Sequence, residues 1–136
     1  MSLLPPCSGI IVFDNDKTVL VSTHIGNYSF PKGKRNKNET SLETAWRELT
    51  EETGLTKDNV ELIDETFIDE LSNRKGNLSV RYYVGKLIKP LDTLTFDPEE
   101  LNKVEWISID DALNLSKLVD KRKEVLNTAY TKYQKN

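Results

Sequence analysis

The chain has 136 residues, a length that fits one domain and leaves little room for a second. Apolar residues make up 37% and charged residues 30% of it, which is the composition of an ordinary soluble globular protein. The formal net charge of −3 excludes an overall positive electrostatic field that would attract nucleic acid. An anionic ligand would therefore have to be bound by a local cluster of cations or by a metal.

Two residue types occur only once in the chain, and this limits the kinds of covalent link and metal site that it can form. Cys7 is the only cysteine, so no intrachain disulfide can form, and His24 is the only histidine, which excludes zinc sites rich in either residue. The first six residues lack the basic and apolar regions of a signal peptide, and no apolar stretch approaches the roughly 20 residues that span a bilayer. We therefore expect a cytoplasmic protein with no membrane partner.

Two strands and a long loop are predicted first. Residues 9–13, GIIVF, are almost continuously apolar and rich in β-branched side chains, which predicts a buried strand, and residues 18–22, TVLVS, predict a second. The turn-forming residues 14–16, DND, predict a hairpin between them. Glycine, asparagine and proline mark residues 26–33 as a loop, which the polar residues 34–39 continue.

An amphipathic helix follows the loop. Its apolar residues recur at i, i+3, i+4 and i+7, and they are Leu42, Ala45, Trp46 and Leu49. We assign Trp46 of this stripe to the core. Thr40 and Glu43 fit a capping box that would start the helix, and Gly54 stands where a glycine would end it.

The second half of the chain repeats the alternation of strands and helices. Further strands are predicted at residues 60–63, 66–68, 78–88 and 104–107. Residues 73–77 predict a turn between two of them, and residues 110–118 and 121–133 predict closing helices, with Ser108 as an N-cap. The order of elements predicts a mixed α+β fold in one domain over residues 1–136.

Carboxylates gather on one face of the predicted central helix. Glu48 lies three and four residues before Glu51 and Glu52, so all three share a face, which we place opposite the apolar stripe. Like charges at this spacing destabilise a bare helix by about 0.2–0.5 kcal/mol per pair. A cation such as Mg²⁺ would offset the repulsion, and glutamates of ordinary pKa need lose no proton to bind it at neutral pH. A solvated acidic face is the alternative for this run alone.

A wider spacing decides between these two interpretations. Five residues separate Gly33 from Glu39, and seven more separate Glu39 from residues 47–55, RELTEETGL. Every fixed position and both apolar positions of the Nudix box are present. Seven specified residues would match at one register with a probability of about 10⁻⁸ at average composition. The chain therefore resembles the Nudix hydrolases, and we call residues 33–55 the box.

The resemblance implies a fold and a metal site. The fold is a mixed β-sheet sandwiched between helices, with the box as loop, helix and loop. The metal is Mg²⁺, with Mn²⁺ as the alternative, held by Glu48, Glu51 and Glu52 with the backbone carbonyl of Lys32. Glu51 and Glu52 are also assigned to catalysis, together with Arg47, which is similar to the family arginine that orients a box glutamate.

Three further positions of the box take structural roles from the resemblance. Gly33 would let the backbone pass close to the metal, Glu39 would brace the loop, and Gly54 would cap the helix.

A general base is expected outside the box. Many relatives carry a glutamate in the loop before a strand that ends in tryptophan, and here Glu99 and Glu100 precede Trp106. The offset of six residues favours Glu100, with Glu99 left open and Glu70 as the next candidate. A carboxylate there could take a proton from a water activated by the metal. An ordinary polar loop is the alternative.

Substrate contacts are expected from lysines and tyrosines. Lys32 and Lys34 flank the metal loop and can neutralise phosphates. Tyr82 and Tyr83 could stack on a base, although neighbours in a strand face opposite sides, so that only one can line the site. The triplet at residues 31–33, PKG, resembles that of diadenosine polyphosphate hydrolases, as does the stretch 104–130. We expect a dinucleoside polyphosphate such as diadenosine tetraphosphate as substrate.

Three other functions stay open. The first strand also resembles that of diphosphoinositol polyphosphate hydrolases, although this chain lacks their usual Gly-Gly-Gly at the metal loop. An mRNA decapping enzyme shares the PKG triplet but would be expected to carry an additional RNA-binding region. A binding module without activity would generally lose box glutamates, and this chain keeps all of them. We expect a small phosphorylated molecule as partner, no nucleic acid, and a monomer or homodimer.

Overall fold

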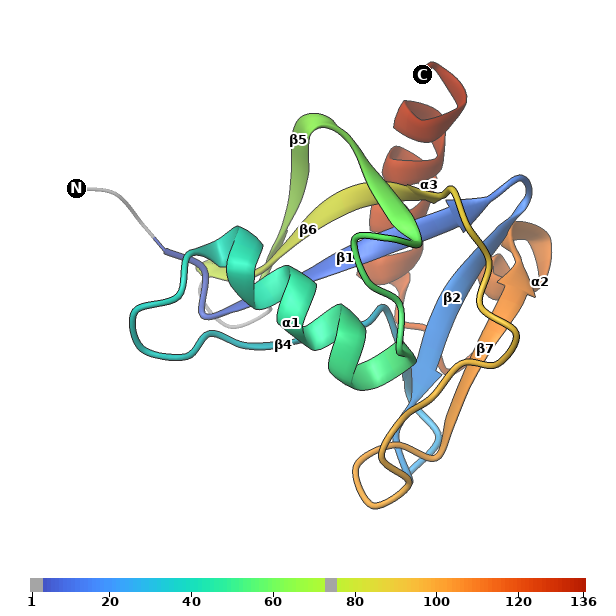
Figure 1. The fold of residues 1–136 in the computed structure, drawn as a ribbon, viewed down its shortest axis with the longest axis horizontal. Coiled ribbons are helices and arrows are strands. Elements are labelled where there is room, and N and C mark those ends of the chain that lie inside the picture. Colours follow the sequence, from blue (N-terminus) through green and yellow to red (C-terminus); the bar gives the residue numbers. More distant parts are fainter. Residues whose placement is uncertain (1–3, 73–75) are drawn as a thin grey trace.

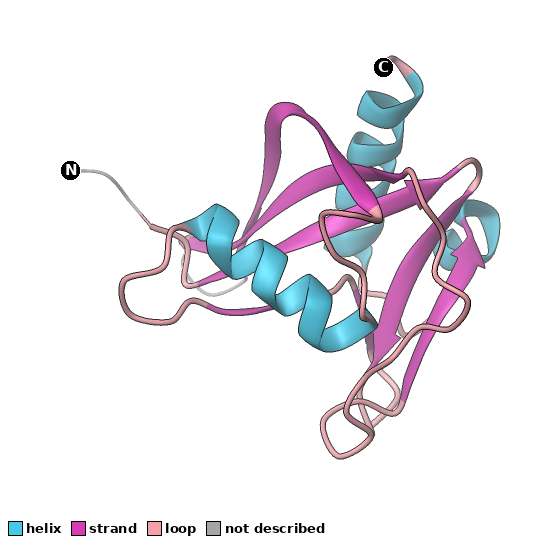
Figure 2. Ribbon diagram, in the orientation of Figure 1, coloured by secondary structure: helices cyan, strands magenta, loops and turns pink. Residues whose placement is uncertain are grey.

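Seven strands and three helices make up the computed structural model, which describes residues 4–72 and 76–136. The strands are β1 (Cys7–Asp14), β2 (Lys17–Ser22), β3 (Tyr28–Ser29), β4 (Lys32–Lys34), β5 (Val60–Leu71), β6 (Leu78–Leu87) and β7 (Lys103–Ser108). The helices are α1 (Ser41–Thr53), α2 (Ile109–Leu113) and α3 (Asp120–Gln134). Figure 2 shows how the two types of element are distributed.

The strands form one mixed sheet in the order β3-β2-β1-β6-β5, with β4 paired to β1 and β7 paired to β2. β1 and β6 are parallel, and all other pairs are antiparallel. Helix α1 lies over one face of the sheet and α3 over the other (Figure 1). This arrangement confirms the predicted α+β fold with its sheet between helices.

Strand β1 is buried on both faces, which explains its nearly continuous apolar sequence. Ile10 and Val12 join a core cluster with Leu49 of α1, whereas Ile11 and Phe13 join the cluster under α3. The hairpin to β2 forms as predicted, and Asn15 takes the positive φ of 55° that its turn requires.

Helix α1 begins and ends where its sequence predicts. Thr40 accepts from the Glu43 backbone N–H and Glu43 accepts from the Thr40 backbone N–H, so both halves of the capping box are present. Gly54 ends the helix in the left-handed region with φ 83°. Leu42, the first residue of the predicted apolar stripe, is nevertheless 36% exposed.

Strand β5 is longer than predicted. Residues 60–63 and 66–68 were expected as separate strands, but β5 runs through both, with a register shift between Leu62 and Phe67 against β6. Asp64 has a φ of 53°, so the polar residues bulge out of the ladder and the strand then resumes. The turn predicted at 73–77 falls partly on residues 73–75, which lie outside the described residues.

Two other predictions need correction. The helix expected at 110–118 stops at Leu113, because the Asn114 side chain donates to the Asp110 carbonyl and its backbone N–H bonds to Asp111. Ser108 does cap this short helix. The loop expected at 26–33 contains strand β3 and the start of β4, and β4 places the box glycine beside β1.

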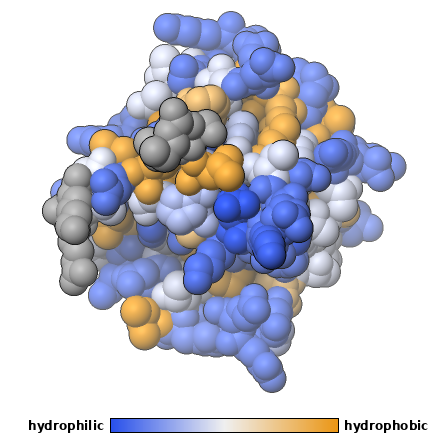
Figure 3. Space-filling model, turned by 90° about the vertical axis from the view of Figure 1, so that its left-hand side faces the viewer, coloured by the Kyte–Doolittle hydropathy of each residue, from blue (hydrophilic) through white to orange (hydrophobic). Residues whose placement is uncertain are grey.

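The surface carries both hydrophilic and hydrophobic groups. Figure 3 shows the face on the left of Figure 1, where hydrophilic residues cover most of the surface and hydrophobic groups lie in separate patches. Among the described residues, no helix combines the length and the apolar composition that a bilayer crossing requires.

Candidate active site

The box brings α1 and β4 together so closely that one position has no room for a side chain. A Cβ atom added to Gly33 would overlap the carboxylate of Glu48. Beside it, the Lys32 backbone N–H donates to Glu52 Oε1 at 3.0 Å. Glu48 and Glu52 therefore both face β4, one turn apart on α1, and the glycine of the box is explained by space rather than by backbone conformation.

Arg47 is the centre of the hydrogen-bond network around the site. Its Nε donates to Glu39 Oε2 at 2.7 Å and its Nη2 to Glu39 Oε1 at 3.0 Å, a bidentate pair. Nη1 donates to Glu48 at 3.0 Å and to Glu51 at 3.2 Å, and Nη2 donates to the Lys34 carbonyl at 2.8 Å. Arg47 thus joins α1 to the loop after β4.

Glu39 is the side chain that holds Arg47 in this orientation. The Arg47 guanidinium and the Asn36 backbone N–H lower the pKa of Glu39 to about 2. Thr44 also donates to Glu39 Oε1, at 2.9 Å. Glu39 is therefore ionised at neutral pH and has several partners, an arrangement that supports the bracing role proposed for it.

Burial changes the acidity of the two glutamates that face β4. The pKa of Glu52 is raised to about 8, mainly by desolvation and also by the charges of Glu48 and Glu100, while the Lys32 backbone N–H acts against the rise. Desolvation also raises the pKa of Glu48, against the lowering effect of Arg47. The expectation of ordinary glutamate pKa values is therefore wrong for this pair, because the sequence alone did not show their burial.

The three box glutamates do not converge on one point. Glu51 is half exposed and faces Arg47, whereas Glu52 faces the Lys32 backbone. In the part of the chain that the structure describes, no group of three His, Cys, Asp or Glu side chains is placed to hold a metal ion. Glu48 and Glu52 still fit a hard cation, because they are oxygen donors held together against their mutual repulsion.

Glu100 is close enough to this pair to act on it electrostatically. Its charge raises the pKa values of both Glu48 and Glu52. Both Glu99 and Glu100 are exposed on the loop before β7. The offset from Trp106 thus identified a residue on the site side of the fold.

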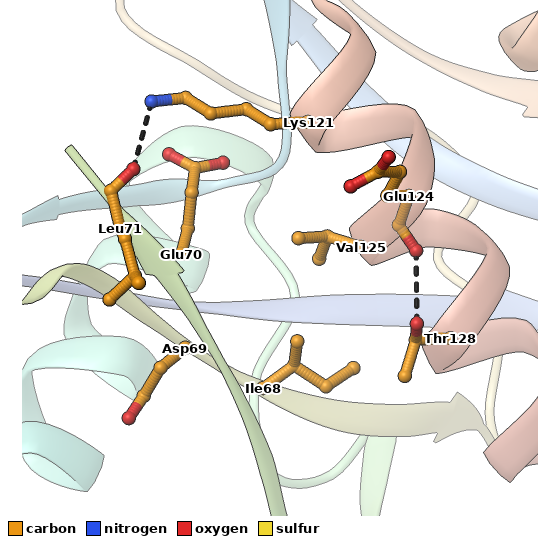
Figure 4. Close-up of a pocket in the computed structure, with 8 residues that line it drawn as sticks. All are labelled: Ile68, Asp69, Glu70, Leu71, Lys121, Glu124, Val125 and Thr128. Atoms are coloured by element: carbon orange, nitrogen blue, oxygen red, sulfur yellow. Dashed lines mark hydrogen bonds between the residues drawn. The ribbon is translucent and has the colours of Figure 1, made fainter. Parts of the chain in front are cut away.

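Glu70, the next candidate for the base, lies on the other face of the sheet. It is 3% exposed and pairs with Arg122 of α3 at 3.3 Å. It also lines a cavity of about 340 Å³ between β5 and α3. Figure 4 shows Glu70 beside Lys121, whose Nζ donates to the Leu71 carbonyl, and no residue that lines this cavity belongs to the box.

Lys32 and Lys34 flank Gly33 on β4 as the sequence suggests. Because side chains alternate along a strand, both lysines point away from the face of β4 that Glu48 covers. The charge of Lys32 nevertheless lowers the pKa of Glu52. The two lysines are therefore adjacent to the glutamates along the backbone but lie on the opposite face of β4, and no ion pair found among the described residues joins them to the box glutamates.

The two tyrosines on β6 differ completely in environment. Tyr82 is fully buried and packs edge-on against Phe30, so the expectation that it could bind substrate is wrong. Tyr83 is half-buried on the α1 face, and its hydroxyl lies 2.6 Å from the Ser41 hydroxyl. As predicted, only one of the two rings is accessible, and Trp46 is half-buried against the α1 core with Lys57 over its ring.

Sequence reasoning missed the backbone partners of the site. The Lys34 carbonyl accepts a hydrogen bond from Arg47. The backbone N–H groups of Lys32 and Asn36 donate to Glu52 and Glu39, respectively. Backbone groups occur at every residue, so no side-chain motif identifies them in advance. They become apparent only once β4 is paired with β1.

The sequence profile of the NUDIX domain matches residues 3–129. Nudix hydrolase 3 of Caenorhabditis elegans is 29% identical over 134 residues, which cover 90% of this chain and 54% of that protein. The m7GpppN-mRNA hydrolase dcap-2 of the same organism is 34% identical over 114 residues, 78% of this chain and 14% of that protein. The chain thus spans about half or less of the length of these relatives.

Solved structures share the fold at lower sequence identity. A C. elegans Ap4A hydrolase in a binary complex superposes with a TM-score of 0.82 at 18% identity, covering 96% of this chain and 99% of that one. RenU, a Nudix hydrolase from M. smegmatis, superposes with a TM-score of 0.75 at 15% identity over 96% of this chain and 86% of that one. The α+β architecture is therefore that of these proteins.

Proposed function

This chain belongs to the Nudix family, and from that premise we propose that it is a metal-dependent hydrolase of phosphoanhydride bonds, acting on a dinucleoside polyphosphate. The observation that carries the proposal is the pair of buried glutamates against β4. Glu48 overlaps the space that a side chain at Gly33 would need, and Glu52 is held by the Lys32 backbone. Arg47 fixes the geometry from the other side.

Glu48 and Glu52 would hold the metal, Mg²⁺ or Mn²⁺, with the Lys32 carbonyl as a further oxygen donor. Glu51 would complete the set by rotating away from Arg47, which it contacts at 3.2 Å from an exposed position. A bound cation of this kind polarises phosphate oxygens and activates water. The contribution of the protein is to hold these oxygens in a partly buried site, where their charge is poorly screened.

Glu100 would serve as the general base. It would accept the proton of the attacking water on a carboxylate oxygen, and its exposed position allows that proton to leave to solvent. Lys32 and Lys34 start from the opposite face of β4, so their long side chains would have to reach around the strand to neutralise the phosphates that lie beyond the metal. Tyr83 is the one tyrosine of the β6 pair with an accessible ring for a base, and its hydroxyl is anchored by Ser41.

Three arguments support a dinucleoside polyphosphate. The residues 31–33, PKG, and the C-terminal stretch resemble diadenosine polyphosphate hydrolases, and the fold superposes on a protein described as an Ap4A hydrolase. A four-phosphate bridge carries about four negative charges, for which Lys32 and Lys34 of β4 would provide compensation. Asymmetric cleavage, faster than that of a nucleoside triphosphate, is the expected activity.

Two alternatives have an observation in their favour. Lys34 directly after Gly33 adds positive charge beside the metal loop, which would suit a more highly charged diphosphoinositol polyphosphate. The likeness to dcap-2 over 78% of this chain favours a capped RNA. We rank both below the dinucleoside polyphosphate.

The metal requirement is tested by chelation and by one substitution. We expect turnover with Mg²⁺ or Mn²⁺ and none in excess EDTA, and we expect Glu52→Gln to lower kcat about 10²-fold or more with the fold intact. Glu61→Gln, which alters an exposed glutamate of β5, is the matched control and should behave as wild type. Full turnover in EDTA, or a normal rate for Glu52→Gln, would exclude the assignment.

Substrate choice is tested by comparing kcat/KM on one enzyme preparation. The substrates are diadenosine tetraphosphate, ATP, a diphosphoinositol polyphosphate and capped RNA, with products identified by mass. We expect diadenosine tetraphosphate to give the highest value. A kcat/KM about tenfold or more higher for another ligand corresponds to about 1.4 kcal/mol in transition-state binding. Such a result would make that ligand the substrate in place of diadenosine tetraphosphate.

A further inference from the structure

His24 lies on a tightly closed turn at the end of β2. The Thr23 backbone N–H donates to the Asn27 carbonyl at 2.9 Å, and the Gly26 N–H donates to the Thr23 carbonyl at 2.9 Å. The Asn27 N–H also donates to the Thr23 hydroxyl at 3.3 Å. The backbone around His24 is therefore held in place by its own turn, although the His24 side chain is exposed.

The segment that carries Glu100 is a second, separate turn. The backbone N–H groups of Glu100 and Leu101 both donate to the Asp97 carbonyl, at 3.1 and 3.0 Å. After Glu100, the chain is anchored by the buried Leu101 and by the Asn102 N–H, which donates to the Ser22 carbonyl at 2.8 Å. At the start of the turn, the Glu99 backbone N–H donates to Asp97 Oδ1 at 2.9 Å. This bond lies within the turn, so an anchor to the rest of the fold has to come from another segment.

His24 supplies that anchor across a sequence separation of 74 residues: its Nε2 lies 2.9 Å from the carbonyl oxygen of Pro98. Since a carbonyl only accepts, Nε2 must carry a proton and donate it. Pro98 stands two residues before Glu100. Resting on the proposed role of Glu100 as general base, we propose that His24 is a positioning residue, which fixes the turn so that Glu100 reaches the site of reaction.

The geometry explains why this contact matters for rate rather than for folding. Glu100 is exposed, so no packing holds its side chain, and its direction depends on the turn beneath it. A general base must come within hydrogen-bond reach of the proton that it accepts. Losing the His24 contact would leave the start of the turn with only its internal hydrogen bonds to Asp97, whereas the anchors at Leu101 and Asn102 would keep the chain folded.

Three variants test the contact. His24→Ala removes the donor and is expected to lower kcat about 3- to 10-fold, the factor that corresponds to one net hydrogen bond, with little change in KM or Tm. His24→Gln keeps an N–H at a similar reach and should recover most of the rate. Ile25→Ala, at a 79% exposed neighbour on the same turn, is the control and should match wild type.

Combining the change with Glu100→Gln separates this proposal from the one on which it rests. If His24 acts through Glu100, then His24→Ala lowers kcat in the wild-type background but adds nothing in the Glu100→Gln background. An equal loss in both backgrounds, or no rescue by His24→Gln, overturns the positioning role while leaving the base in place. A normal rate for Glu100→Gln alone overturns the base, and the positioning role with it.

Discussion

Gly33 provides a direct test at the scale of single residues. Its φ is not in the left-handed region, so the position needs glycine only because the Glu48 carboxylate occupies the space of a side chain. That carboxylate is the end of a flexible chain and can move aside. We expect Gly33→Ala to lower kcat about 10²-fold or more, because Glu48 is displaced, with little change in Tm. Steady-state kinetics and thermal melting are the measurements.

Gly9 is the matched comparison, because its neighbours are rigid. A Cβ atom at Gly9 would overlap the Pro31 carbonyl oxygen and crowd Lys32 Cα, both of them backbone atoms. Gly9→Ala is therefore expected to lower Tm clearly. If Gly33→Ala unfolds the protein to the same extent, the steric argument for Glu48 is wrong.

The sequence predicted the identities of the site residues better than their environments. Spacing alone placed Glu48 and Glu52 on one helix face, but it could not show that burial raises the pKa of Glu52 to about 8. Alternation predicted that Tyr82 and Tyr83 face opposite sides without saying which one is buried. The burial of Glu52 and the choice between Tyr82 and Tyr83 both depend on which face of the sheet each helix covers, and this is a property of the tertiary structure.

At the scale of elements, α1 depends on its capping box. Thr40→Ala removes the hydroxyl that accepts from the Glu43 N–H and is expected to lower the free energy of unfolding by about 1 kcal/mol. Thr40→Ser retains an acceptor and should lose much less. Urea denaturation measures both, and equal losses for the two variants would mean that the hydroxyl is not what stabilises this end of the helix.

Local signals explain which elements could be predicted. The start and end of α1 are encoded by Thr40, Glu43 and Gly54, all within the helix or beside it, and the prediction was confirmed. The continuity of β5 was missed, because only the ladder with β6 carries the strand past Asp64. Strand pairing between residues that are far apart in the sequence cannot be recognised from the few residues around any one position.

For the whole molecule, the ion pair of Glu70 and Arg122 joins β5 to α3 (Figure 4 shows the Glu70 side). Arg122→Ala would leave Glu70 buried without its partner. We expect the free energy of unfolding to fall by about 2–4 kcal/mol. This is less than for a fully buried ion pair, because the Arg122 side chain is 20% exposed and solvent screens its charge.

The double variant Glu70→Leu with Arg122→Met removes both charges and should recover part of that loss. Urea unfolding of the wild type, of Arg122→Ala and of the double variant gives the comparison. A double variant less stable than Arg122→Ala alone would show that the pair itself stabilises the fold.

The parallel pairing of β1 with β6 has a consequence for how the chain is made. Ile10 pairs with Tyr83, 73 positions later, so β1 leaves the ribosome long before its neighbour exists. Until residues up to Leu87 have been synthesised, this apolar strand has as strand partners only β2, its hairpin partner, and the three-residue β4. The nascent chain therefore exposes its most hydrophobic strand for most of translation, the interval in which chaperone binding and aggregation compete with folding.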